Sequence, residues 1–215
     1  MALNLFADLT PECVLACGHA AAGFSYKVFL DKGDIEAAAR ELYEAKYFIE
    51  DISVVDVLEG LEVHYHFGHF ENPRRIAVRV LAGHDTPEVP SIAGIFQGAE
   101  WHERESMDFL PVKFTGNPNP VPLLLPDDMA GECPLAKTEE TRKSYLDMMG
   151  PFTFESGADD HPLKKLEADR IQAAKEAAEK AEAERKAAEE AAKKAAEEKA
   201  AEEAAKAAEG NEAEA

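Results

Sequence analysis

The sequence HYHFGH, from His64 to His69, brings together three side chains of a type that binds metal ions. His64 and His66 are two residues apart, so they project from the same face if this segment is a strand, and His69 follows the turn-forming Gly68. Three imidazoles can bind zinc or nickel. However, no acidic residue stands at a spacing that would orient the rings. The pattern therefore favours an exposed sheet face that carries histidines over a stand-alone metal-binding protein.

Cys13, Cys17 and His19 form a second group of possible metal ligands. The two thiols are four residues apart and would share one face of a helix, but an iron–sulfur cluster usually needs four ligands. Small buried cysteines are therefore favoured. Cys133 brings the total to three, which is too few and odd for a disulfide framework and is typical of a reducing compartment.

His102 and Glu103 begin like the helix of a zinc protease, but Ser106 stands where the second histidine is required. The sequence also has no glycine-rich phosphate loop, no nucleophile elbow and no CxxC pair. It therefore predicts no catalytic, cofactor-binding or metal-binding residue in this chain.

One predicted helix carries an arginine among acids beside a tryptophan. Arg104 is four residues from both Glu100 and Asp108, so it could bridge two carboxylates along one face. Trp101 and Glu105 fall close to Asp108 at helical spacing. Such a cluster suits a partly desolvated contact with another chain, because Trp and Arg are frequent anchors of interfaces. A solvated helix with ordinary ion pairs is the alternative.

The same helix begins a longer motif, which reads Glu100-Trp101-His102-Glu103-Arg104-Glu105, then Met107-Asp108-Phe109, then Phe114-Thr115-Gly116-Asn117-Pro118-Asn119, then Leu123-Leu124-Leu125-Pro126-Asp127-Asp128. This motif resembles the signature of the 30-kilodalton subunit of respiratory complex I, the NADH-quinone oxidoreductase of bacteria. Weaker similarity extends back to about Asp34 and forward to Gly131-Glu132-Cys133-Pro134-Leu135.

Several positions depart from the family pattern. Pro111 stands where the family usually has glycine, Asn117 replaces the usual histidine, and Val121-Pro122 replaces an arginine-bearing step. Glu132-Cys133 and Ala136 miss the usual histidine and arginine. The resemblance is therefore to a divergent member, and it leaves open the contacts that the family makes through those side chains.

The resemblance implies a non-catalytic peripheral-arm subunit of a proton-translocating NADH-quinone oxidoreductase, held on the cytoplasmic side of the bacterial inner membrane. NADH, FMN, iron–sulfur clusters and quinone would be bound by other chains of the complex. The expected partners are the quinone-site subunit, which is related to hydrogenase large subunits, and the iron–sulfur subunits. The alternative is an equivalent subunit of a membrane-bound hydrogenase or of a ferredoxin-linked quinone oxidoreductase. The residues expected at the partner interface are Trp101, Glu103, Arg104, Glu105, Asp108, Phe109, Phe114, Gly116, Pro118, Pro126 and Asp127.

Composition limits the choice of partners. The 215 residues include 43 acidic and 23 basic side chains, a net charge of −20, so phosphate backbones and anionic lipids would be repelled and nucleic acid is not an expected partner. No run approaches the roughly 20 apolar residues of a membrane helix. The apolar stretch from Cys13 to Phe24 contains His19 and follows no basic residue, so it does not read as a secretory signal. Other subunits would hold the chain at the membrane.

Hydrophobic periodicity predicts an α+β fold, with helices packed on a small mixed or antiparallel sheet. A helix that begins at Asp34 would bury Ile35, Ala38, Ala39, Leu42 and Tyr43 on one face. The other predicted elements are a helix over 10–22 ended by Gly23, strands over 24–30, 47–57, 61–67 and 75–81, and a helix over 101–109.

The remainder of the chain is predicted to be less regular. Residues 111–134 are proline-rich and should form an extended segment that runs over a surface. The predicted divisions are an α+β domain over 1–130, an extended linker over 131–163 and a low-complexity Ala/Glu/Lys tail over 164–215, either helical or disordered.

Overall fold

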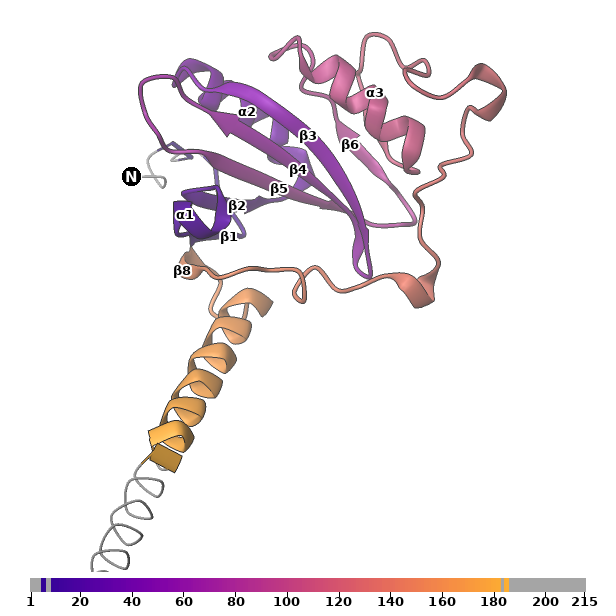
Figure 1. Cartoon of the computed structure of the whole chain (residues 1–215). Helices are drawn as coiled ribbons and strands as arrows, with labels where there is room; N and C mark the ends of the chain where they lie inside the picture. The colour runs from indigo at the N-terminus through magenta and orange to yellow at the C-terminus, as the bar shows by residue number, and fades with distance from the viewer. Residues whose placement is uncertain (1–4, 7–8, 183, 186–215) are drawn as a thin grey trace, which may run out of the picture. The chain divides into compact units, whose positions relative to one another are not determined.

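A six-stranded mixed sheet forms the centre of the fold in the computed structural model, which describes residues 5–6, 9–182 and 184–185 (Figure 1). Its strands are Cys13–Ala16 (β1), Tyr26–Leu30 (β2), Phe48–Val57 (β3), Gly60–Gly68 (β4), Ile76–Ala82 (β5) and Thr153–Gly157 (β8). They lie in the order β3-β4-β5-β2-β1-β8, in which β2 and β5 are parallel and the other neighbours antiparallel. The predicted α+β class is confirmed.

The strands predicted over 47–57, 61–67 and 75–81 form β3, β4 and β5, joined as two successive hairpins. Alternation along β4 divides its side chains between the two faces of the sheet. Leu61, Val63, Tyr65 and Phe67 are buried in the main core, whereas Glu62, His64 and His66 point to the second face.

Two helices cover the main face of the sheet. Residues of Ile35–Glu44 (α2) and Ala99–Phe109 (α3) belong to the same buried cluster as the strands. The predicted inner face of α2 is confirmed for four positions, whose spacing of three and four residues forms one apolar stripe. The fifth, Tyr43, is 56% exposed and lies with its ring edge against Phe96, 5.6 Å between centroids.

The helix predicted over 10–22 is wrong for its first part. Residues 13–16 form β1, which pairs with β2 on one side and β8 on the other, and only His19–Ala22 (α1) is helical. Thr10-Pro11 reads locally as a helix start, but a run of buried apolar residues is equally compatible with an inner strand. Gly23 ends α1 as predicted, with φ of 73°.

Segment 131–163, predicted as an extended linker, contributes to the sheet and to a second core. β8 pairs with β1, and Met149 and Leu163 pack with Cys13, Leu15 and Phe29 on the second face. The chain divides into two compact units at Glu167 and Ala168.

Residues 162–182 are helical, and the rest of the helix predicted from Leu166 to Glu209 lies largely outside the described residues. Within the described residues, no helix is both long and apolar enough to cross a membrane.

Candidate docking site

The charged motif forms α3, at the position predicted for it. Ala99 and Glu103 face the core, and the helix packs along β3. It ends at Leu110, whose extended backbone conformation is favoured by the following Pro111. The buried charges of α3 then hold the chain segments on either side of it.

Glu103 is fully buried and accepts three hydrogen bonds, which we call the Glu103 cluster. The donors are Ser91 Oγ at 2.6 Å, Ile92 N at 2.9 Å and Asn117 Nδ2 at 2.7 Å. Burial raises the pKa of Glu103, although these three donors oppose the shift. The fully buried Tyr65 also has its pKa raised, by burial and by the nearby Glu103 charge. The cluster ties α3 to the segments before and after it.

Arg104 holds the proline-rich segment through backbone carbonyls. Its Nε donates to Val121 O and its Nη2 to Pro122 O, both at 2.9 Å, and the side chain is 8% exposed. The nearest Glu100 oxygen is 3.9 Å from Nη1. The predicted bridge from Arg104 to two carboxylates is therefore wrong in the main, because two carbonyls of the next segment take the guanidinium instead.

Asp108, one turn further along α3, holds the next three residues of that segment. Its Oδ2 accepts the backbone N–H groups of Leu123, Leu124 and Leu125 at 3.0, 2.7 and 3.1 Å. Burial alone would raise the pKa of Asp108, but these bonds and the Arg104 charge outweigh it and lower the pKa. Arg104 and Asp108 thus bind five consecutive residues, which we call the Arg104–Asp108 pair.

The structure explains two of the departures from the family pattern. Asn117 occupies the usual histidine position and donates to Glu103, which an imidazole N–H could also do. Val121 and Pro122 contribute carbonyl oxygens to Arg104, so this contact does not depend on their side chains. The motif keeps its internal hydrogen bonds despite both substitutions.

Apolar side chains point outward from this framework. Trp101, Val121, Leu124 and Leu135 are 60%, 50%, 59% and 60% exposed, and we call these four residues the docking surface. The framework holds each of them. The Arg104 guanidinium lies 5.6 Å from the Trp101 ring, Val121 and Leu124 are held by the Arg104–Asp108 pair, and Leu135 N bonds Phe109 O at 3.0 Å.

The predicted interface residues therefore divide into two sets. Glu103, Arg104, Asp108 and Phe114 are buried within this chain, and Phe109 is half-buried. The exposed set is Trp101, Glu105, Gly116, Pro118, Pro126 and Asp127. The sequence reasoning missed Val121, Leu124 and Leu135, whose only signal was an apolar side chain within a proline-rich segment.

A second anchor holds the chain beyond the docking surface. The Asp56 carboxylate at the end of β3 is fully buried and accepts bonds from Arg142 Nε at 2.8 Å and Lys137 N at 2.8 Å, and it pairs with His84 Nε2 at 2.9 Å. Burial would raise the pKa of Asp56, but its partners lower it. This anchor fixes the return path of the chain toward β8.

The histidines and cysteines are placed differently from the sequence prediction. His64 and His66 share the second face of the sheet, but His64 is largely buried and pairs with Glu62 at 2.8 Å, so the face is not an exposed one. His69 lies in the β4–β5 connection, with its ring against Tyr47. Among the described residues, no three metal-ligand side chains are grouped closely enough to hold a metal ion.

The cysteines do not lie on one helix. Cys13 is buried in β1, and burial raises its pKa to about 12. Cys17 follows that strand and is half-buried.

Comparison with known proteins identifies the family. Residues 28–145, more than half of the chain, match the family described as the respiratory-chain NADH dehydrogenase 30 Kd subunit. The chain belongs to this family. The matched range contains α3, the docking surface and the Asp56 anchor, so the resemblance drawn from the motif is confirmed.

Curated relatives carry names from several electron-transfer complexes. The chain is 35% identical over 82 residues to a subunit of the F(420)H(2) dehydrogenase of Methanosarcina mazei, a match that covers 38% of this chain and 52% of the relative. It is 37% identical over 108 residues to a subunit of the NADH-quinone oxidoreductase of Roseiflexus sp. strain RS-1, covering 48% and 62%. The match thus spans little more than half the length of these relatives.

A solved structure shares the fold. It belongs to the membrane-bound sulfane sulfur reductase, an archaeal respiratory membrane complex. The TM-score is 0.53 at 23% identity, and the match covers 60% of this chain and 78% of that one.

Proposed function

We propose that this chain is a peripheral, structural subunit of a membrane-associated quinone oxidoreductase complex, and that the docking surface binds the neighbouring quinone-site subunit. Membership of the 30 Kd subunit family supports a place in such a complex. The observation that carries the docking role is the exposure of Trp101, Val121, Leu124 and Leu135 on segments held by buried hydrogen bonds.

The framework accounts for how this surface would bind. Apolar side chains on a mobile loop lose conformational entropy when they are ordered by a partner, which weakens binding. Here the Arg104–Asp108 pair fixes the backbone of residues 121–125 through five hydrogen bonds before any partner arrives. Trp101 supplies a large anchor of the kind that dominates interface energies. The predicted role of Arg104 thus becomes indirect, because it positions the surface rather than reaching the partner.

The chemistry of the complex would lie in other chains. NADH, FMN, iron–sulfur clusters and quinone remain the expected cofactors of those chains, and this subunit would contribute the docking of the quinone-site subunit. A position on the cytoplasmic side of the membrane, held by the other subunits, follows from the same proposal.

A second candidate differs in the electron donor. The relative from Methanosarcina mazei is named for F(420)H(2), whereas the relative from Roseiflexus is named for NADH. The docking role is common to both candidates. NADH-binding flavoprotein subunits in the same complex would favour the second relative's chemistry, and another electron-input subunit would favour the first.

Purification of the tagged chain from gently solubilised native membranes tests the proposal. Mass spectrometry of the co-purified chains should identify the quinone-site subunit and iron–sulfur subunits, and the electron-input subunit should name the donor. Recovery of the chain without any such subunit, under conditions that preserve quinone-reductase activity in the membranes, would refute the proposal.

A further inference from the structure

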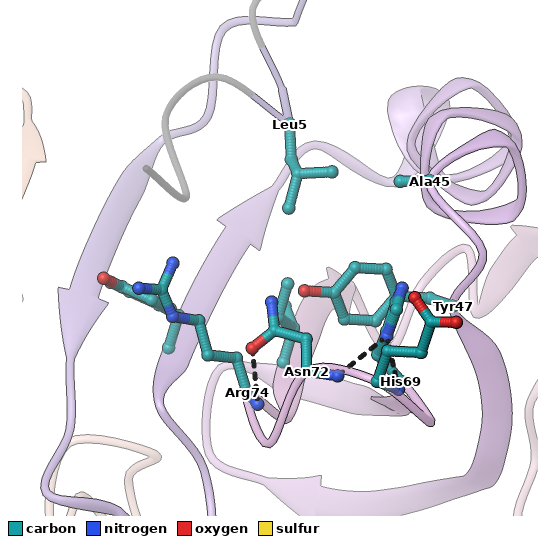
Figure 2. A pocket seen from close by; sticks show the side chains of 9 residues that line it. Leu5, Ala45, Tyr47, His69, Asn72 and Arg74 are labelled. Carbon is teal, nitrogen blue, oxygen red and sulfur yellow. Dashed lines mark hydrogen bonds between the residues drawn. The ribbon is translucent and has the colours of Figure 1, made fainter.

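A cavity of about 430 Å³ lies at the end of the sheet, away from the docking surface in sequence and in its lining residues. It is formed where β2 and β5 begin, where α2 ends, and beside the β4–β5 connection. Figure 2 shows Arg74, Asn72 and His69 side by side along one wall, with Leu5 and Ala45 on the opposite wall. One wall is thus polar and the other apolar.

Hydrogen bonds within the β4–β5 connection set the tautomer of His69. Its Nδ1 accepts the backbone N–H groups of Glu71 at 3.1 Å and Asn72 at 3.0 Å. A nitrogen that accepts cannot carry a proton, so the proton of the neutral ring lies on Nε2. His69 therefore offers the cavity a donor rather than an acceptor.

The amide of Asn72 is oriented in a similar way. Its Oδ1 accepts the backbone N–H of Arg74 at 3.2 Å, which leaves Nδ2 to face the cavity, as Figure 2 shows. The Arg74 guanidinium adds further donors and a positive charge. Burial raises the pKa of Tyr47, so its phenol stays protonated and can also donate.

The donor set determines the class of ligand. Donors of four side chains converge on the cavity, in a protein whose net charge is −20. Glu71 is the acidic residue among those that line the cavity, and its side chain is exposed. Ile76 and Leu5 provide apolar surface. We propose that this cavity binds a small organic carboxylate with an apolar body, its carboxylate bonded by Arg74 and Asn72.

Backbone amide shifts of the full chain, recorded by NMR during titration with benzoate, test this proposal. Benzoate should bind saturably with a dissociation constant on the order of 1 mM, as expected for a ligand of this size. The shifts should be centred on residues 69–76. Benzyl alcohol, which is similar in size and neutral, should bind about tenfold more weakly or worse, because charged hydrogen bonds are the stronger ones.

Two variants and one control locate the carboxylate. Arg74→Gln removes the charge, and Asn72→Asp keeps the Oδ1 acceptor for Arg74 N while replacing the donor with an anion. Each should weaken benzoate binding about tenfold or more. Arg40→Gln, at an exposed position on α2, should leave it unchanged. Absence of saturable benzoate binding to the wild-type chain, or equal affinity in Arg74→Gln and Arg40→Gln, would overturn the proposal.

Discussion

Two buried carboxylates of α3, five residues apart, behave in opposite ways. Glu103 and Asp108 each accept three hydrogen bonds, yet the pKa of Glu103 is raised and that of Asp108 is lowered. The Glu103 donors are two neutral side chains and one backbone N–H in the dry core. Asp108 has three backbone N–H groups and the Arg104 charge at the edge of the core.

The difference teaches which carboxylate needs its charge. In the Glu103 cluster, the carboxyl group mainly completes a hydrogen-bond network, and desolvation of its anion works against the fold. In the Arg104–Asp108 pair, the anion itself binds the converging N–H groups. Shape and hydrogen bonding thus dominate at one end of α3, and charge dominates at the other.

The largest expected effect is that of Glu103→Ala. It leaves Ser91, Ile92 N and Asn117 without their common acceptor inside the core, so the free energy of unfolding should fall by about 3–5 kcal/mol. Urea unfolding measures this. Glu105→Ala, on the exposed side of the same helix, is the matched control and should change stability by less than about 0.5 kcal/mol. Equal losses in both variants would refute the cluster's role.

Removing charge without removing shape sharpens the comparison. Asp108→Asn should cost about 2 kcal/mol, because bonds to a charged acceptor are lost, whereas Glu103→Gln should cost about 1 kcal/mol. Both values come from urea unfolding near pH 7. A larger loss for Glu103→Gln than for Asp108→Asn would contradict the assignment.

The two sites should respond to pH with opposite signs. The lowered pKa of Asp108 means that its contribution is present above the unfolded value of about 4 and is lost as pH falls. The raised pKa of Glu103 means that its contribution is complete below about 4 and declines as pH rises through the folded value. Between about pH 3 and pH 7, the Asp108→Asn penalty should therefore grow with pH and the Glu103→Gln penalty should shrink. Parallel slopes would reject this interpretation.

A smaller effect is expected for Arg104→Lys. The variant keeps the charge but cannot reproduce the paired contacts of Nε and Nη2 with two carbonyls, so stability should fall by about 1 kcal/mol. Thermal unfolding of the variant beside Arg40→Lys measures the difference. An unchanged transition would show that the paired contacts are not needed.

The sequence predicted the elements whose signals are local. The apolar stripe of α2, the alternation along β4 and the proline after α3 each lie within one segment, and the structure has all three. β1 was missed because its strand state depends on pairing with β8, which lies about 140 residues later in the chain. Local preference at Pro11 could not reveal that partner.

The candidate site was predictable in composition but not in orientation. The motif named Glu103, Arg104 and Asp108 as important, and the structure turns all three inward. Helical spacing places side chains on a face but does not say what covers that face. Leu124 and Leu135 gave no signal, because their exposure depends on the path of the proline-rich segment. Their role in docking stays a prediction, as does that of Trp101.

The central claim is that exposed apolar residues on a fixed framework dock the neighbouring subunit. Its most direct test is the amount of quinone-site subunit that co-purifies with Trp101→Ala/Leu124→Ala, compared with the control Tyr43→Ala/Leu58→Ala, which removes equally exposed side chains elsewhere. Urea unfolding must first show that both double variants are within about 1 kcal/mol of wild type. The account predicts that the first variant loses the partner, by about tenfold or more, while the control retains it. Full retention by Trp101→Ala/Leu124→Ala would contradict the account.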